Sequence, residues 1–182
     1  MAGRLSVLSF LFAIMTVASA AAAVLTVQPD GSGTHPTIAA AVQDAQSGDT
    51  IQLGDGTFTG DGNRDIPITG KSLYIRSVSG DPTTCVIDAD GSEAWPRYIF
   101  EVTDSTGETV IIEGITLRGA WRPASRISLA GGAVVSDATT QLTISNCVFR
   151  DNHAAYGGAV GLAGGPHEIT GCRFEMNQAS PS

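Results

Sequence analysis

The sequence predicts an all-β protein, a right-handed parallel β-helix in which each turn of a solenoid contributes short strands. Three observations predict this fold. A motif recurs after 25 residues, the segment between its copies is rich in glycine and proline, and β-branched or aromatic residues surround the motif.

The repeat carries Ile, Cys, Phe, Asn and Ala in the same order and at offsets 0, 3, 5, 8 and 10 in both copies. A Gly-Gly-Ala-Val segment precedes each copy, at Gly131–Val134 and Gly157–Val160. A fixed period of this size indicates a solenoid. The copies are Ile144, Cys147, Phe149, Asn152 and Ala154, then Ile169, Cys172, Phe174, Asn177 and Ala179, with a weaker upstream copy at Ile112, Ile115, Leu117 and Ala120.

The offsets alone also fit a leucine-rich repeat, which returns through a helix or a helical turn. The segment from Gly158 to Pro166 argues against that alternative, because it contains four glycines and a proline. Both residue types disfavour a helix. Each repeat is therefore expected to hold two or three short strands, which makes the solenoid a parallel β-helix.

The combination of Gly-Gly-Ala-Val with Phe-x-x-Asn resembles the repeat of the chlamydial polymorphic membrane proteins, which are autotransporter-type surface proteins. The resemblance covers both copies closely and the upstream copy loosely. The motif residues themselves have structural roles. We expect Gly157 and Gly158 to form a turn, Phe174 to stack on Phe149 in the core, and Asn177 to stack on Asn152 as a ladder between coils.

Cys147 and Cys172 occupy the same offset, so they should stack about 4.8 Å apart in successive coils. That separation permits a disulfide, but parallel side chains give it poor geometry. Buried thiols are favoured, and a disulfide between Cys147 and Cys172 remains the alternative. Cys85 is unpaired in either case. No Cys/His cluster has metal-ligand spacing, and we expect His35, His153 and His167 to be solvated.

Residues 1–23 have the pattern of a secretory signal peptide. Arg4 precedes an apolar core at Leu5–Val17, and Ala18-Ser19-Ala20 forms a cleavage site. The core has 13 residues, too few to span a bilayer, although an uncleaved anchor remains an alternative. No other stretch could cross a membrane. Residues 24–182 are then one β-helix domain of about four or five coils.

Without the signal the chain has nine basic and 18 acidic residues, a net charge of −9. Such a surface does not suit nucleic acid or an anionic membrane. It suits an exported protein, either secreted or displayed on the cell surface.

The chain begins with a strand at Val24–Gln28, followed by the only strong helix prediction. Pro36 suits a first helical position, and Ile38, Ala41, Val42 and Ala45 form one apolar stripe that ends before Gly48. An amphipathic helix of this kind can cover the open end of a β-helix. Further strands are predicted at Asp49–Leu53, Leu73–Val78, Cys85–Asp88, Tyr98–Val102 and Thr109–Leu117.

The passage from Thr37-Ile38 through Gly48-Asp49-Thr50-Ile51 to Gly56-Thr57-Phe58 resembles the opening of pectin methylesterases, pectate lyases and other polysaccharide-active β-helix enzymes. The catalytic groups of such enzymes are not found. Glu101 and Glu113 are isolated, Glu175 lies in a turn, and Asp88–Gly91 begins like a calcium loop without its remaining ligands. We predict no catalytic residues, no metal and no cofactor.

Two loops each combine Trp, Arg and Pro, and they are the candidate ligand contacts. Trp95 with Arg97 and Trp121 with Arg122 lie 26 residues apart by their tryptophans, one coil period. Both tryptophans could project from one side of the solenoid, where indole rings stack on sugars and arginines bind hydroxyls or carboxylates. Alternatively, each Trp folds back over the flank of a coil.

The sequence therefore favours an exported, non-enzymatic β-helix module for adhesion or contact with extracellular polysaccharide or a cell-surface component. The alternative is the N-terminal part of a polysaccharide-degrading lyase or esterase. The next Gly-Gly-Ala copy would fall near position 183, so we expect a C-terminally truncated solenoid. Its uncovered last coil should promote end-to-end self-association.

Overall fold

The computed structural model describes residues 21–103, 107–123, 131–137 and 139–180. The expected signal peptide falls almost entirely on residues 1–20, outside the described residues. No helix of the described part is long and apolar enough to cross a membrane.

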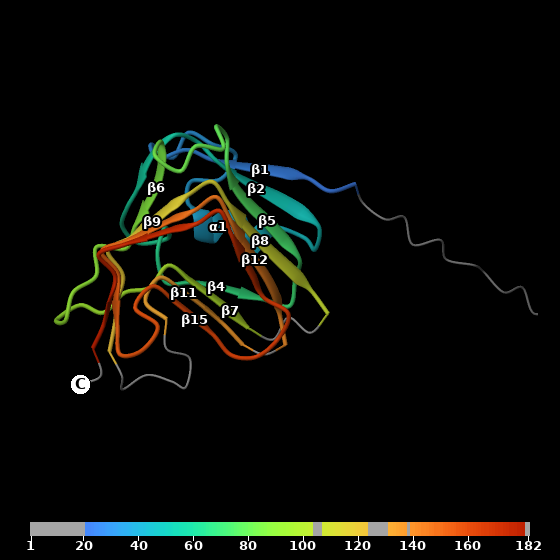
Figure 1. Cartoon of the computed structure of the whole chain (residues 1–182). Coiled ribbons are helices and arrows are strands. Elements are labelled where there is room, and N and C mark those ends of the chain that lie inside the picture. Colours follow the sequence, from blue (N-terminus) through green and yellow to red (C-terminus); the bar gives the residue numbers. More distant parts are fainter. Residues whose placement is uncertain (1–20, 104–106, 124–130, 138, 181–182) are drawn as a thin grey trace, which may run out of the picture.

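All strand pairs between named strands are parallel, and they form three long sheets and one short one around a single core (Figure 1). The first sheet contains β1 (Val24–Val27), β2 (Asp49–Leu53), β5 (Leu73–Ser77), β8 (Thr109–Glu113), β12 (Gln141–Ser145) and β16 (Glu168–Thr170). The second contains β3 (Gly56–Phe58), β6 (Cys85–Asp88), β9 (Thr116–Arg118), β13 (Val148–Arg150) and β17 (Arg173–Glu175). The third contains β4 (Ile66–Thr69), β7 (Phe100–Thr103), β11 (Val134–Ser136) and β15 (Val160–Leu162), and the fourth β10 (Trp121–Arg122), β14 (His153–Ala154) and β18 (Gln178–Ala179).

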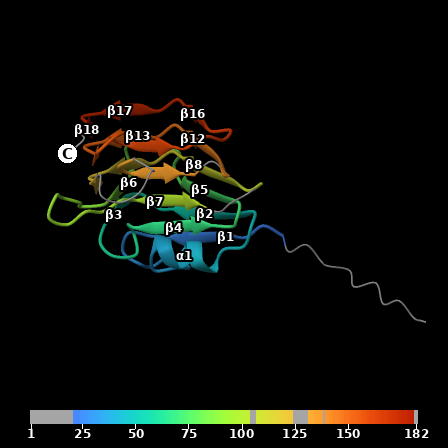
Figure 2. The ribbon, with the colours of Figure 1, turned by 90° about the horizontal axis from the view of Figure 1, so that it is seen from below.

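The chain visits the first, second and third sheets in turn, so the described strands make five coils that begin at β2, β5, β8, β12 and β16. From the third coil onward the chain also passes through the fourth, short sheet. Figure 2 shows these coils stacked from the N-terminal to the C-terminal end. The predicted all-β parallel β-helix is confirmed.

Isoleucines from successive coils form a column through the core, because the strand register of the first sheet places them directly above one another. Four of them are fully buried, whereas the fifth, in the last coil, is 38% exposed. The column consists of Ile51, Ile75, Ile112, Ile144 and Ile169.

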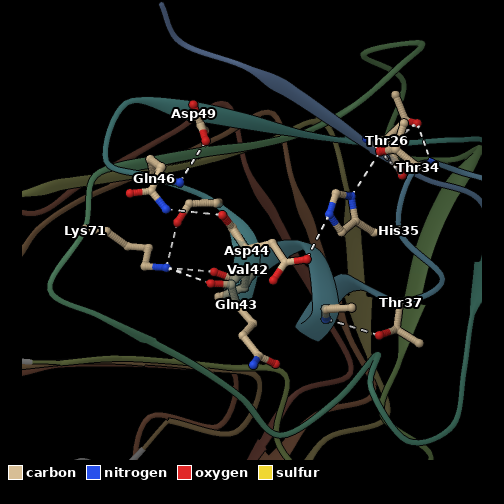
Figure 3. Close-up of polar contacts among 12 residues, drawn as sticks. Thr26, Thr34, His35, Thr37, Val42, Gln43, Asp44, Gln46, Asp49 and Lys71 are labelled. Carbon is tan, nitrogen blue, oxygen red and sulfur yellow. Dashed lines mark hydrogen bonds and ion pairs between the residues drawn. The ribbon is translucent and has the colours of Figure 1, made fainter. Parts of the chain in front are cut away.

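Helix α1 (Ile38–Asp44) lies across the N-terminal end of the solenoid (Figure 2). Ile38, Ala41 and Val42 are buried against the first coil, as the apolar stripe predicted. The N–H of Ala40 donates to Thr37 Oγ1 over 3.2 Å, which caps the N-terminus. At the C-terminus Lys71 Nζ donates to the carbonyl of Val42 and to that of Ala45 (Figure 3).

The asparagine ladder joins three coils through side-chain amides. Asn152 Nδ2 donates to the carbonyl of Leu117 in the coil below and to Asn177 Oδ1 in the coil above, over 3.0 Å each. Its Oδ1 accepts from the N–H of Ala120. Asn177 repeats the pattern one coil later by donating to the carbonyl of Phe149 over 2.9 Å.

Phe174 stacks on Phe149 with ring centroids 5.0 Å apart and planes 7° apart. Phe149 is fully buried, whereas Phe174, in the last coil, is 52% exposed. The reason is positional, because β17 has a described neighbour on one side only.

All three cysteines are free thiols in the structure. The hydrogen bond with Cys172, together with burial, raises the pKa of Cys147.

The Gly-Gly-Ala motif forms a turn, and it also lets the backbones of adjacent coils approach each other closely. Gly157 and Gly158 lie in the turn before β15. In the first copy, a Cβ on Gly131 would lie 2.1 Å from the backbone nitrogen of Gly161, and one on Gly132 would lie 2.1 Å from the carbonyl oxygen of Gly158. The backbones of coils three and four therefore approach too closely for any side chain there.

Two strand predictions need correction. The single strand at Thr109–Leu117 is two strands, β8 and β9, separated by a corner at Gly114 with φ 68°. Strand β4 was missed because Pro67 lies within it, yet β4 is the edge of the third sheet, where a proline removes no ladder hydrogen bond.

The prediction of three solvated histidines is also wrong, because each is half-buried. The His35 ring lies 3.4 Å from Asp44 Oδ2 (Figure 3), and His153 stacks on an aromatic ring.

Candidate functional site

A cleft of about 460 Å³ opens at the corner between the second and third sheets, lined mainly by coils two and three and, through Asp65, by coil one. The loop between β6 and β7 forms one wall and β10 the other; this loop projects from the left of both ribbon views, in yellow-green (Figures 1 and 2). The lining residues are Asp65, Trp95, Pro96, Arg97, Tyr98, Glu101, Trp121, Arg122 and Pro123.

Backbone hydrogen bonds fix this loop against the next coil. Ser92 and Trp95 close a turn through reciprocal N–H to carbonyl bonds of 3.0 and 3.1 Å. Arg97 pairs in antiparallel fashion with Trp121 through bonds of 2.9 and 2.8 Å. The loop from coil two is thereby attached to β10 of coil three, and this pairing brings all four candidate ligand contacts to one cleft.

The two tryptophans have different surroundings. Trp121 is half-buried and stacks on His153 of coil four, with ring centroids 3.7 Å apart and planes 21° apart. It therefore covers the flank of a coil, which is the alternative role considered above. Trp95 is 71% exposed, so most of its side chain faces solvent. Its indole face is available to a ligand that enters the cleft.

The cleft contains two ion pairs. Arg97 Nη1 lies 3.4 Å from Asp65 Oδ2, and both side chains are about one-third exposed. Arg122 Nη2 donates to Glu101 Oε2 over 2.7 Å, and this arginine is 92% buried, since its side chain is 8% exposed. The guanidinium carbon of Arg122 also lies 4.5 Å from the centroid of the Tyr98 ring, in cation–π contact.

One donor in the cleft remains unused. Arg122 Nη1 is buried and has no hydrogen-bond partner. Buried donors are normally paired. Because this nitrogen is itself buried, it lies behind the cleft surface and is not exposed to a ligand. Burial and the nearby carboxylates of Glu101 and Asp65 raise the pKa of Tyr98 to about 12. Its hydroxyl therefore stays protonated at neutral pH.

Three residues that line the cleft, Asp65, Tyr98 and Glu101, are not among the ligand contacts predicted from the sequence. The sequence predicts an isolated Glu101, but its alternation with buried Phe100 and Val102 places it on the outer face of β7, within reach of Arg122. Asp65 directly precedes β4, a strand that the sequence did not predict. It has φ 54°, and its Oδ1 accepts from the N–H of Tyr98 over 3.0 Å, which ties the start of β4 to the cleft.

The other acidic candidates are engaged elsewhere. Asp88 pairs with Arg118 at 2.9 Å and accepts from the N–H of Asp90, so the segment that begins like a calcium loop is a turn. Glu113 accepts from the hydroxyl of Tyr74, and Glu175 pairs with Arg173. Among the described residues, no three His, Cys, Asp or Glu side chains gather closely enough to hold a metal ion.

Comparison with known proteins gives one likeness. No family model matches the chain, and no curated protein matches it. Among solved structures, the crystal structure of pectate lyase Pel9A is similar, with a TM-score of 0.47 and 15% sequence identity. The match covers 86% of this chain and 50% of that structure, so this chain spans about half its length. At this level the likeness carries no argument about activity, and the link to the chlamydial repeat is not shown.

Proposed function

We propose that the chain is an exported β-helix module that binds carbohydrate in the cleft between coils two and three. The observation that carries the proposal is Trp95, a large aromatic side chain that is 71% exposed and lines a cleft containing two ion pairs. An indole face buries the C–H face of a sugar ring, and polar groups beside it bind the hydroxyls. Export rests on the signal pattern of residues 1–23.

The rest of the cleft supplies what such a ligand needs. Arg97 and Arg122 donate hydrogen bonds, whereas Asp65 and Glu101 accept them. Both walls are held by the solenoid, so the groups are positioned before the ligand arrives. Pre-organisation of this kind reduces the entropic cost of binding.

The alternative, part of a lyase or esterase, would have to use Asp65 and Glu101, the carboxylates of the described cleft lining. Each of them is held by an arginine. Because guanidinium groups already engage these oxygens, the carboxylates are better placed to orient a ligand than to exchange protons with it. The cleft therefore supports binding better than catalysis.

Tryptophan fluorescence tests the proposal, because the chain has only two tryptophans. We expect a panel of purified polysaccharides to include one that changes the emission of the wild type and of Trp121→Phe, in which Trp95 is the sole reporter. Calorimetry should show that Trp95→Ala loses binding of that polysaccharide. Tyr156→Ala is the matched control, since Tyr156 is an exposed aromatic residue (62%) that does not line the cleft.

Binding that survives in Trp95→Ala would contradict the role of the cleft. Binding lost equally in Tyr156→Ala would show that the ligand occupies a different surface.

A further inference from the structure

The charges in the cleft cancel one another. Two arginines and two carboxylates line it, and they are joined as Arg97–Asp65 and Arg122–Glu101. The remaining lining residues, Trp95, Pro96, Tyr98, Trp121 and Pro123, carry no charge at neutral pH. Neither arginine is therefore a free positive charge to which an anionic ligand would be drawn.

An acidic sugar would have to displace an existing partner. If a uronate carboxylate took Arg122 from Glu101, it would leave a mostly buried carboxylate without its counter-charge, which is costly. If it bound without displacement, it would lie beside Glu101 or Asp65 and repel them. The chain as a whole carries a net charge of −8, which adds a weaker, salt-screened repulsion of polyanions.

A sugar hydroxyl faces no such conflict, because it both donates and accepts. It can donate to a carboxylate of an ion pair and accept from the arginine of the same pair, so the pair need not break. Trp95 stacks on neutral and acidic sugar rings alike, so the ion pairs decide between them.

Resting on the proposed function, we propose that the cleft selects neutral carbohydrate and rejects acidic carbohydrate, because Asp65 and Glu101 already occupy the arginines that a uronate would need. The carboxylates then determine specificity, whereas the exposed tryptophan provides general affinity for sugar rings.

Calorimetric titration with oligosaccharides of one length tests this selectivity. The probes are neutral hexasaccharides of glucose, mannose, xylose and galactose, with hexagalacturonate as the acidic counterpart. We expect at least one neutral hexasaccharide to bind about tenfold more tightly than hexagalacturonate, by analogy with the value of a charged hydrogen bond. Its affinity should not change when the salt concentration rises.

If hexagalacturonate binds more tightly than every neutral probe, the selectivity is wrong while the binding function stands. If no hexasaccharide binds, both proposals fall.

A gain of binding in variants provides the sharper test. Asp65→Asn keeps the Oδ1 acceptor for the N–H of Tyr98 and suits φ 54°, but it frees Arg97. Glu101→Gln frees Arg122 in the same way. Each variant should bind hexagalacturonate about tenfold more tightly than wild type, since it offers a charge-assisted hydrogen bond that was previously occupied.

The matched control is Asp61→Asn, which changes the net charge equally but removes a 91%-exposed carboxylate outside the cleft lining. It should leave the affinity for hexagalacturonate unchanged. If neither cleft variant gains more than this control does, the carboxylates do not set the selectivity.

Discussion

Coil two differs from coils four and five at the corner that follows the second sheet. In coils four and five this corner is formed by the repeated motif, where Asn152 and Asn177 bond to the backbones of neighbouring coils. In coil two the chain instead leaves the solenoid in a loop that carries Trp95 and Arg97 and pairs with β10 of coil three. The regular corner stabilises the solenoid, whereas the irregular one forms a cleft.

This difference separates stability from binding, and substitutions on the two sides should separate them experimentally. Changes in the regular coils should lower the free energy of unfolding. Changes at the cleft should alter binding while the fold remains.

The largest loss of stability is expected from Phe149→Ala. Phe149 is fully buried between Leu117 and Phe174, so its removal leaves a cavity and should cost about 3–5 kcal/mol. Urea unfolding followed by circular dichroism measures the change. A variant that unfolds at the same urea concentration as wild type would show that the assigned register is wrong.

Asn152→Ala should have the next largest effect. The substitution leaves the N–H of Ala120 and the carbonyl of Leu117 without their side-chain partner, at a cost of about 1–3 kcal/mol. Asn177→Ala is the matched control in the last coil, where the side chain is more exposed and the loss should be smaller. Equal losses in both variants would contradict the burial of the ladder.

Phe174→Ala should cost less than Phe149→Ala, about 1 kcal/mol, because the ring is half-exposed.

Phe174 contributes to an apolar hollow over the last coil, together with Ile169 and Leu162. We therefore propose that the isolated chain associates through this surface. Sedimentation velocity should show association that rises with concentration in wild type and falls in Phe174→Asp. A wild type that is monomeric throughout the concentration range would contradict the proposal.

Trp95→Ala should have the smallest effect on stability, within about 0.5 kcal/mol, because the side chain is mostly in solvent. Thermal melting compared with wild type measures it. A large loss would mean that Trp95 supports the loop and is not a free ligand contact.

The same contrast explains what the sequence could predict. Period and composition suffice for the stacked coils, because Phe149, Asn152 and Ile144 recur at fixed spacing and each copy confirms the other. The cleft has no repeat. Arg97 and Trp121 were found as unusual loop residues, but Asp65 and Glu101 join the site through pairing between strands that lie far apart in the chain. Spacing along a sequence does not encode such pairs.

The burial of Phe174 illustrates a second limit. Phe149 and Phe174 occupy identical motif positions, yet one is fully buried and the other 52% exposed. A motif specifies which way a side chain points, but its burial depends on whether another coil lies above it.

Hydrogen–deuterium exchange with and without bound polysaccharide tests the central claim most directly, because one experiment at low protein concentration reports on both regions. We expect ligand to slow exchange in the peptides spanning residues 92–101 and 119–123. The peptide spanning 142–154 should exchange slowly in the free protein and should not change when ligand binds. Ligand protection confined to residues 142–179, with no change at 92–101, would contradict the separation of binding from stability.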